Sequence, residues 1–151
     1  TTREAFDRVL DTPEFHAIDR KKPHPGVAIQ EITAAGGLAV LAHPAQLRFG
    51  PEAPDWTSLL RELKGAGLKG LECYYSTFSP QETAMYCSLA DMLGLYVTVG
   101  SDFHGEKIKP DIQMGTGILG SLLKAPKELP ILRELGAVTA SKGQASAIDK
   151  T

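Results

Sequence analysis

The sequence predicts an α/β fold in which helices cover a sheet of parallel strands. From residue 25 onward one plan repeats three times: an amphipathic segment ends at glycine, and a short apolar, β-rich run follows at once. The glycine junctions are Gly37, Gly67 and Gly94, a spacing of about 30 residues, which is the length of one strand–helix–strand step. The strand candidates show little polar alternation, as expected of parallel strands that lie under helices. A barrel and an open sheet both fit this pattern.

Three helix–strand units are expected in chain order: 25–37 with 38–42, 55–67 with 68–75, and 79–94 with 95–100. The third helix has the clearest limits, because Ser79 suits the N-cap, Pro80 suits the first helical position and Glu82 completes a capping box. Gly94 is expected to end this helix in the left-handed conformation. Its apolar face is expected to comprise Met85, Tyr86, Leu89, Ala90 and Leu93.

The two ends of the chain are less regular. Residues 1–10 predict a helix with a capping box from Thr1 and Glu4. The basic, proline-bounded stretch 18–25 predicts a connector in which His24 caps the next helix or lies on the surface. After the third strand the chain is rich in glycine and proline, and it closes on a segment with the polar composition of a mobile tail.

The composition excludes several classes of protein. The 151 residues suit one domain, and 16 Lys and Arg against 18 Asp and Glu give a net charge of −2, which argues against a protein that holds nucleic acid by charge alone. No apolar stretch approaches the roughly 18–20 residues of a membrane helix, and the sequence opens without the layout of a signal peptide. We therefore expect a cytoplasmic protein with no membrane partner. Cys73 and Cys87 are expected to be buried thiols rather than disulfide partners.

The candidate catalytic residues follow the predicted strands. Parallel α/β proteins carry their functional side chains at the carboxyl ends of the strands. The first strand runs into His43, and the third runs into Asp102 and His104. Alternate residues of an extended segment project to one side, so Asp102 and His104 are expected to aim a carboxylate and an imidazole at a common point. Two imidazoles and a carboxylate are a common ligand set for Zn²⁺, Mn²⁺ or Fe²⁺, which makes these three residues the candidate metal ligands.

Other polar residues lie near the same strand ends. Glu72 stands inside the second β-rich run, where an unpaired buried carboxylate is costly, so it is expected either to pair with a cation or to face the site. Tyr75 is a candidate for lining a pocket at the end of this run. Arg48, Lys107 and Lys109 are close in sequence to the candidate ligands and are candidate phosphate-binding cations. Glu72, Arg48 and Lys107 are therefore the predicted substrate-binding residues.

Three motifs resemble those of a known family. Ala42-His43-Pro44, the run GLECYYS at 70–76, and GSDFHG at 100–105 are similar, in order and approximate spacing, to the later motifs of the PHP (polymerase and histidinol phosphatase) superfamily. The resemblance covers residues 25–120. It is greatest to stand-alone PHP phosphoesterases that act on nucleoside 3′,5′-bisphosphates and on the 5′ ends of short RNA.

The resemblance implies a fold and an activity. The fold would be a distorted TIM-like (β/α)7 barrel, of which 25–120 form the C-terminal part, 1–24 the end of a helical insertion with its connector, and 121–151 an extension with a polar tail. His43, Asp102 and His104 match positions that are metal ligands in the family, where two or three divalent metals (Mn²⁺, Zn²⁺ or Fe²⁺) are expected. The implied reaction is hydrolysis of a phosphomonoester or phosphodiester of a small substrate, such as a nucleotide or a short RNA or DNA end, by metal-activated water.

The chain also departs from the family pattern. PHP proteins begin with a His-x-His motif on the first strand, and this chain has none; its histidines are His16, His24, His43 and His104. We therefore expect the C-terminal part of a longer enzyme, whose N-terminal half supplies the other ligands, and we expect the isolated chain to be inactive. Two alternatives stay open: a non-catalytic α/β metal-binding or structural module that needs a partner segment, and an amidohydrolase-like metal hydrolase.

Overall fold

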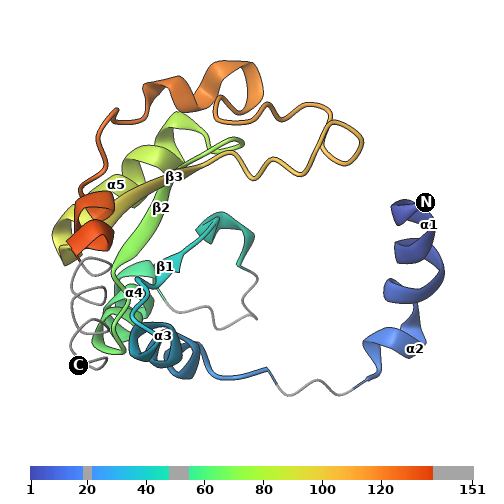
Figure 1. Ribbon diagram of the computed structural model, residues 1–151, viewed down its shortest axis with the longest axis horizontal. Helices are drawn as coiled ribbons and strands as arrows, with labels where there is room; N and C mark the ends of the chain where they lie inside the picture. The colour runs from blue at the N-terminus through green and yellow to red at the C-terminus, as the bar shows by residue number, and fades with distance from the viewer. Residues whose placement is uncertain (19–21, 48–54, 138–151) are drawn as a thin grey trace, which may run out of the picture.

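The computed structural model describes residues 1–18, 22–47 and 55–137, and its centre is a parallel three-stranded sheet (Figure 1). The strands β1 (Val40–Leu41), β2 (Gly70–Tyr75) and β3 (Tyr96–Gly100) lie side by side in the order of the chain. Val40 pairs with Gly70, and Gly70 pairs with Tyr96. The predicted α/β class with parallel strands is confirmed.

The three predicted helices are present, and one precedes each strand in the chain. They are α3 (Pro25–Ala34), α4 (Trp56–Gly65) and α5 (Pro80–Leu93). Helix α5 has the predicted limits: the Ser79 hydroxyl accepts the Glu82 N–H at 3.2 Å, the Glu82 carboxylate accepts the Ser79 N–H at 2.8 Å, and Gly94 adopts φ 59°. His24 caps α3, because its Nδ1 accepts the Gly26 N–H at 3.2 Å. Local signals therefore set both ends of α5 and the start of α3 as predicted.

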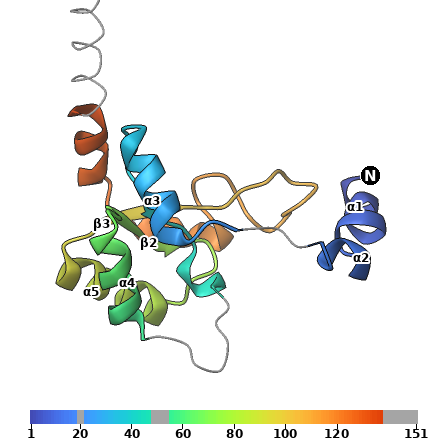
Figure 2. The ribbon, with the colours of Figure 1, turned by 90° about the horizontal axis from the view of Figure 1, so that it is seen from below.

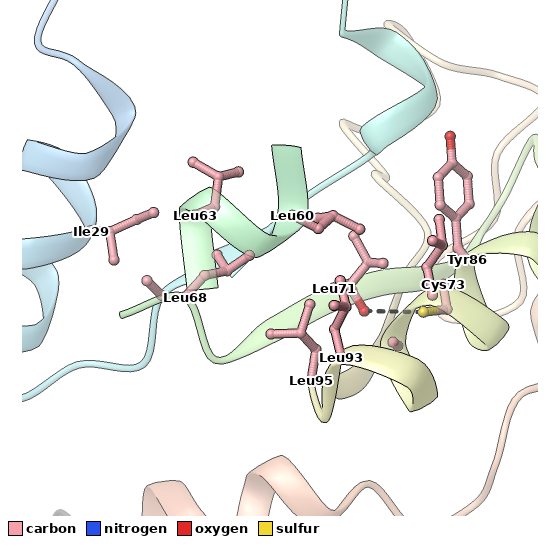
Figure 3. Packing of buried hydrophobic residues seen from close by; sticks show 12 residues of the cluster. Ile29, Leu60, Leu63, Leu68, Leu71, Cys73, Tyr86, Leu93 and Leu95 are labelled. Carbon is pink, nitrogen blue, oxygen red and sulfur yellow. Dashed lines mark hydrogen bonds between the residues drawn. The ribbon is translucent and has the colours of Figure 1, made fainter. Parts of the chain in front are cut away.

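The hydrophobic core lies between the strands and the helices. In Figure 2, α4 and α5 lie together on one side of β2 and β3. Figure 3 shows the core side chains in contact around β2, with Leu60 from α4 and Tyr86 from α5 packed near Leu71 and Cys73. Cys73 is buried and is a free thiol, as predicted, whereas Cys87 is partly buried.

The apolar face of α5 and the limits of the first two strands differ from the prediction; β2 begins at Gly70 rather than at residue 68. Met85 is predicted to lie on the apolar face of α5, but it is 39% exposed. The buried face of this helix consists of Tyr86, Leu89, Ala90 and Leu93. The first strand is shorter than the predicted 38–42, because the carbonyl of Ala39 accepts both the Lys69 and the Gly70 N–H, at 2.9 and 3.2 Å, and the regular ladder begins only at Val40.

The remaining elements lie at the two ends of the described chain. The predicted N-terminal helix is present as α1 (Thr2–Ala5), which continues into a π-helical turn, η1 (Phe6–Leu10), and is followed by the short α2 (Pro13–His16). After β3 come a loop and a 3₁₀ segment, η3 (Ile118–Lys124). The predicted polar tail falls mostly on residues 138–151, outside the described residues. Among the described helices, none has the length and apolar character needed to cross a membrane.

Candidate active site

The carboxyl ends of the three strands bring the candidate residues together. His43 follows β1, Glu72 and Tyr75 belong to β2, and Asp102 follows β3. Since the strands are parallel and adjacent, these four side chains come from one edge of the sheet. Direct contacts link them into one cluster across the three strands.

Glu72 connects the ends of the two outer strands. Its Oε2 accepts the main-chain N–H of His43 at 2.6 Å. Its Oε1 lies too close to the place that a Cβ on residue 100 would take, so the carboxylate fits against the strand end because that residue is Gly100. Burial raises the pKa of Glu72, the His43 N–H opposes this, and the nearby Asp102 charge adds a smaller increase. Of the two predicted alternatives, facing the site describes Glu72 better, and its observed partner is the main chain of His43.

The backbone is unusual at two of the candidate ligands. His43 has φ 31° and ψ 59°, and Asp102 has φ 55°; apart from glycine, Leu119 alone shares this positive-φ region among the described residues. Such conformations cost free energy for residues with a Cβ and occur preferentially at functional sites. The expectation that Asp102 and His104 lie on an extended segment was wrong, because β3 ends at Gly100 and the positive φ of Asp102 is not an extended conformation.

Asp102 is nevertheless close to His104. The His104 Nδ1 is 3.4 Å from the Asp102 Oδ1 and 2.7 Å from the Asp102 main-chain oxygen. The other carboxylate oxygen, Oδ2, accepts the Tyr75 hydroxyl at 2.6 Å and pairs with the Lys109 ammonium. Lys109 and then Tyr75 hold the pKa of Asp102 below its ordinary value. The carboxylate is therefore ionised and fixed in position by three neighbours.

Tyr75 lies in the middle of this cluster and contacts Asp102, Gln46 and His43. It is buried, its hydroxyl accepts the Gln46 side-chain N–H at 2.7 Å, and its ring lies edge-on to the His43 ring with 6.0 Å between centroids. Burial and the hydrogen bond to Asp102 raise the pKa of Tyr75 to about 12. Tyr75 is therefore a neutral donor near pH 7. Gln46 was missed by the sequence analysis, and nothing in its local sequence distinguishes it.

The predicted substrate-binding cations are placed differently from one another. Lys107 is exposed, and with His104 it lines a cavity of about 780 Å³. The other walls of this cavity come from the N-terminal segment and the loop after β3: Thr1, Phe6, Asp7, Asp11 and Ile108. Lys109 instead reaches back to Asp102. Arg48 lies outside the described residues.

The ligand atoms of His43, Asp102 and His104 are of the kinds that bind divalent metals, but too few of them lie close together. Imidazole nitrogen and carboxylate oxygen are ordinary ligands of Mn²⁺, Zn²⁺ and Fe²⁺. Within residues 1–18, 22–47 and 55–137, however, no three His, Cys, Asp or Glu side chains converge closely enough to hold a metal ion. The described part of the chain thus contains an incomplete ligand set, and metal binding by His43, Asp102 and His104 stays a prediction.

The sequence is similar to those of several phosphate-ester hydrolases, although no protein-family model matches it. It is 38% identical over 79 residues to the phosphoribosyl 1,2-cyclic phosphate 1,2-diphosphodiesterase of Eggerthella lenta, covering 52% of this chain and 28% of the relative. It is 35% identical over 77 residues to the 3′,5′-nucleoside bisphosphate phosphatase of Chromobacterium violaceum (51% and 26%). It is 31% identical over 101 residues to the 5′-3′ exoribonuclease of Haemophilus influenzae (67% and 36%). The chain thus spans about a quarter to a third of the length of these curated relatives.

Two solved structures share the fold. A protein of Bifidobacterium adolescentis, described as a metal-dependent phosphoesterase, superposes with a TM-score of 0.60 at 27% identity, over 78% of this chain and 40% of that one. An amidohydrolase of Chromobacterium violaceum, solved with bound sulfate and no metal, gives a TM-score of 0.57 at 28% identity, over 90% and 44%. The comparisons confirm the predicted resemblance to metal-dependent phosphoesterases.

Proposed function

We propose that this chain, a relative of the PHP-type metal-dependent phosphoesterases, forms the C-terminal part of an enzyme that hydrolyses phosphate esters. The observation that carries the proposal is the cluster at the sheet edge, where Asp102 is held ionised beside His104 and where Glu72 binds the main chain of His43. Its relatives are named for cleavage of phosphomonoesters and phosphodiesters. Carboxylate and imidazole groups at the carboxyl ends of parallel strands suit this chemistry.

His43, Asp102 and His104 are the proposed catalytic metal ligands in this enzyme. The remaining ligands would come from a segment outside the 151 residues. Among the described residues, no three His, Cys, Asp or Glu side chains lie close enough together to hold a metal ion, and the relatives are much longer. Two or three divalent ions, Mn²⁺, Zn²⁺ or Fe²⁺, would complete the site. The description of the Bifidobacterium adolescentis neighbour as a metal-dependent phosphoesterase supports the use of divalent metals.

The proposed substrate is a small phosphorylated molecule, such as a nucleoside 3′,5′-bisphosphate or the 5′ end of a short RNA. The 780 Å³ cavity that reaches His104 supports this class, because it combines the ammonium of Lys107 with the apolar side chains of Phe6 and Ile108. A charged phosphate and a flat base or sugar would find suitable partners there. The proposed location is the cytoplasm.

The test is phosphate release by the full-length gene product. The protein is purified with Mn²⁺ and assayed on a nucleoside 3′,5′-bisphosphate, a 5′-phosphorylated RNA oligonucleotide and p-nitrophenyl phosphate. We expect turnover that a chelator abolishes and Mn²⁺ restores, and a loss of at least about 100-fold in His43→Ala and in Asp102→Ala, the size typical of essential catalytic groups. Lys127→Met, at an exposed position, is the control. Unchanged turnover in both site variants would contradict the proposal.

The amidohydrolase neighbour supports a second candidate, hydrolysis of C–N or C–O bonds. The same preparation is assayed on a panel of amides, cyclic imides and lactones. Hydrolysis of these substrates without phosphate release from the first panel would favour this candidate. A protein that binds metal but turns over neither panel would favour a non-catalytic module.

A further inference from the structure

Lys109 is placed beside Asp102 by a turn in the loop after β3. The main-chain N–H groups of Ile108 and Lys109 both donate to the carbonyl of Gly105 at 3.0 Å, and Gly105 has φ 93°, which favours glycine. The buried Ile112 follows, and its N–H donates to the Lys109 carbonyl at 3.2 Å. This turn directs the Lys109 ammonium back to a carboxylate seven residues earlier.

The ion pair occupies Oδ2, one of the two oxygens of the Asp102 carboxylate. Oδ2 receives both the Lys109 ammonium and the Tyr75 hydroxyl, which Gln46 orients from the other side. A carboxylate oxygen has about two lone-pair directions, so these two donors occupy Oδ2. The side chains of Lys109 and Asp102 are only 34% and 21% exposed, so water screens this pair less than a pair on the open surface.

A divalent cation and an ammonium cannot share this carboxylate without repulsion. At contact distance two positive charges repel strongly wherever water is partly excluded. Lys109 would therefore compete with a metal ion for Asp102. The carboxylate that matches a metal-ligand position already pairs with a cation of the protein itself. Lys107, two residues earlier, does not share this position, since it is exposed and lines the neighbouring cavity.

We propose that Lys109 is the resident counter-ion of Asp102, that a divalent cation displaces it on binding this carboxylate, and that the freed ammonium binds a phosphoryl oxygen of the substrate. This inference rests on the proposed function for the identity of the two ligands. Metal binding alone is opposed by Lys109, whereas a phosphate draws the ammonium away from Asp102. Metal and phosphate therefore bind with positive coupling, and Lys109 carries part of that coupling.

The experiment measures Mn²⁺ binding directly, by the electron paramagnetic resonance signal of free Mn²⁺ over the full-length protein. Titrations of wild type, Lys109→Met, Lys109→Arg and the exposed control Lys127→Met are made with and without inorganic phosphate. Without phosphate, we expect Lys109→Met to bind Mn²⁺ about tenfold more tightly than wild type, within the range that such couplings span. Lys109→Arg and Lys127→Met should stay near wild type, because both keep the cation at position 109.

Phosphate gives the second readout. It should tighten Mn²⁺ binding in wild type by a larger factor than in Lys109→Met. Equal or weaker Mn²⁺ binding by Lys109→Met, the same phosphate effect in both proteins, or no Mn²⁺ binding by either would overturn the inference. If the expected binding pattern appears without any turnover, the inference stands and the proposed phosphoesterase activity fails, so the two failures are distinguishable.

Discussion

The carboxylate of Glu72 accepts the main-chain N–H of His43 at 2.6 Å, across 29 positions of sequence. This bond joins the central strand to the residue that follows β1. It also holds the backbone of His43, whose positive φ would otherwise be costly. Glu72 thus positions a candidate ligand through the main chain.

The first prediction separates this acceptor role from the charge of Glu72. Glu72→Gln keeps an oxygen that can accept the His43 N–H, whereas Glu72→Ala removes it. We expect Glu72→Ala to be less stable than Glu72→Gln by about 1–3 kcal/mol, the usual cost of leaving a buried donor without a partner. Urea denaturation followed by circular dichroism measures the difference. Equal midpoints and slopes for the two variants would show that the bond does not hold His43.

The second prediction concerns pH. Burial raises the pKa of Glu72 above its ordinary value of 4.5, so the folded chain holds this proton more tightly than the unfolded chain does. The stabilising contribution of the protonated carboxyl is present below about 4.5 and is lost as the pH rises through the higher folded-state pKa. Glu72→Gln removes this dependence. Its stability relative to wild type should therefore increase from pH 4 to pH 7, as measured by urea midpoints at each pH, and a difference that is flat over this interval would contradict the assignment.

The third prediction tests the fit between Gly100 and Glu72. A Cβ at residue 100 would overlap the Glu72 Oε1, so Gly100→Ala must push the carboxylate away from His43. We expect a cost of about 1–3 kcal/mol, as for other overpacked sites. The cost should nearly vanish when Glu72→Ala is already present. A double-mutant cycle measures this coupling, and additive effects would mean that the two residues do not interact.

The fourth prediction concerns the core on α5. Leu89 is buried at 7% exposure, whereas Met92, three residues later on the same helix, is 59% exposed. Leu89→Ala should cost about 2–5 kcal/mol because it leaves a cavity in the core. Met92→Ala should change stability by less than about 0.5 kcal/mol. Thermal and urea unfolding of this matched pair checks that the helix faces the sheet as described, and similar losses for both variants would argue against it.

The helix limits that could be predicted from the sequence follow from capping residues, which act over a few positions. The limits of α5 follow from Ser79, Glu82 and Gly94, whose side chains and backbone act within a few residues of themselves. The cap at His24 is local in the same sense. Met85 shows the limit of periodicity, because helical spacing places a residue near the apolar face without saying where the core ends.

The site could be predicted only as a set of residue types. His43, Asp102 and His104 stand out because they follow strand candidates, and parallel strands end at one edge. Their geometry could not be predicted in the same way. The positive φ of His43 and of Asp102 occurs where these residues contact Glu72, Tyr75 and Lys109, which come from other elements or from later in the chain.

The sequence by itself determined the order of helices and strands, their parallel arrangement and the chemical types of the candidate ligands, because each depends on neighbouring residues or on a short repeat. Only the tertiary structure decided which polar groups meet. It paired Lys109, rather than Lys107, with Asp102, and it brought Gln46 to Tyr75. Contacts between residues distant in sequence are selected by the packing of whole elements and by the need to satisfy buried polar groups, and no local pattern records that selection.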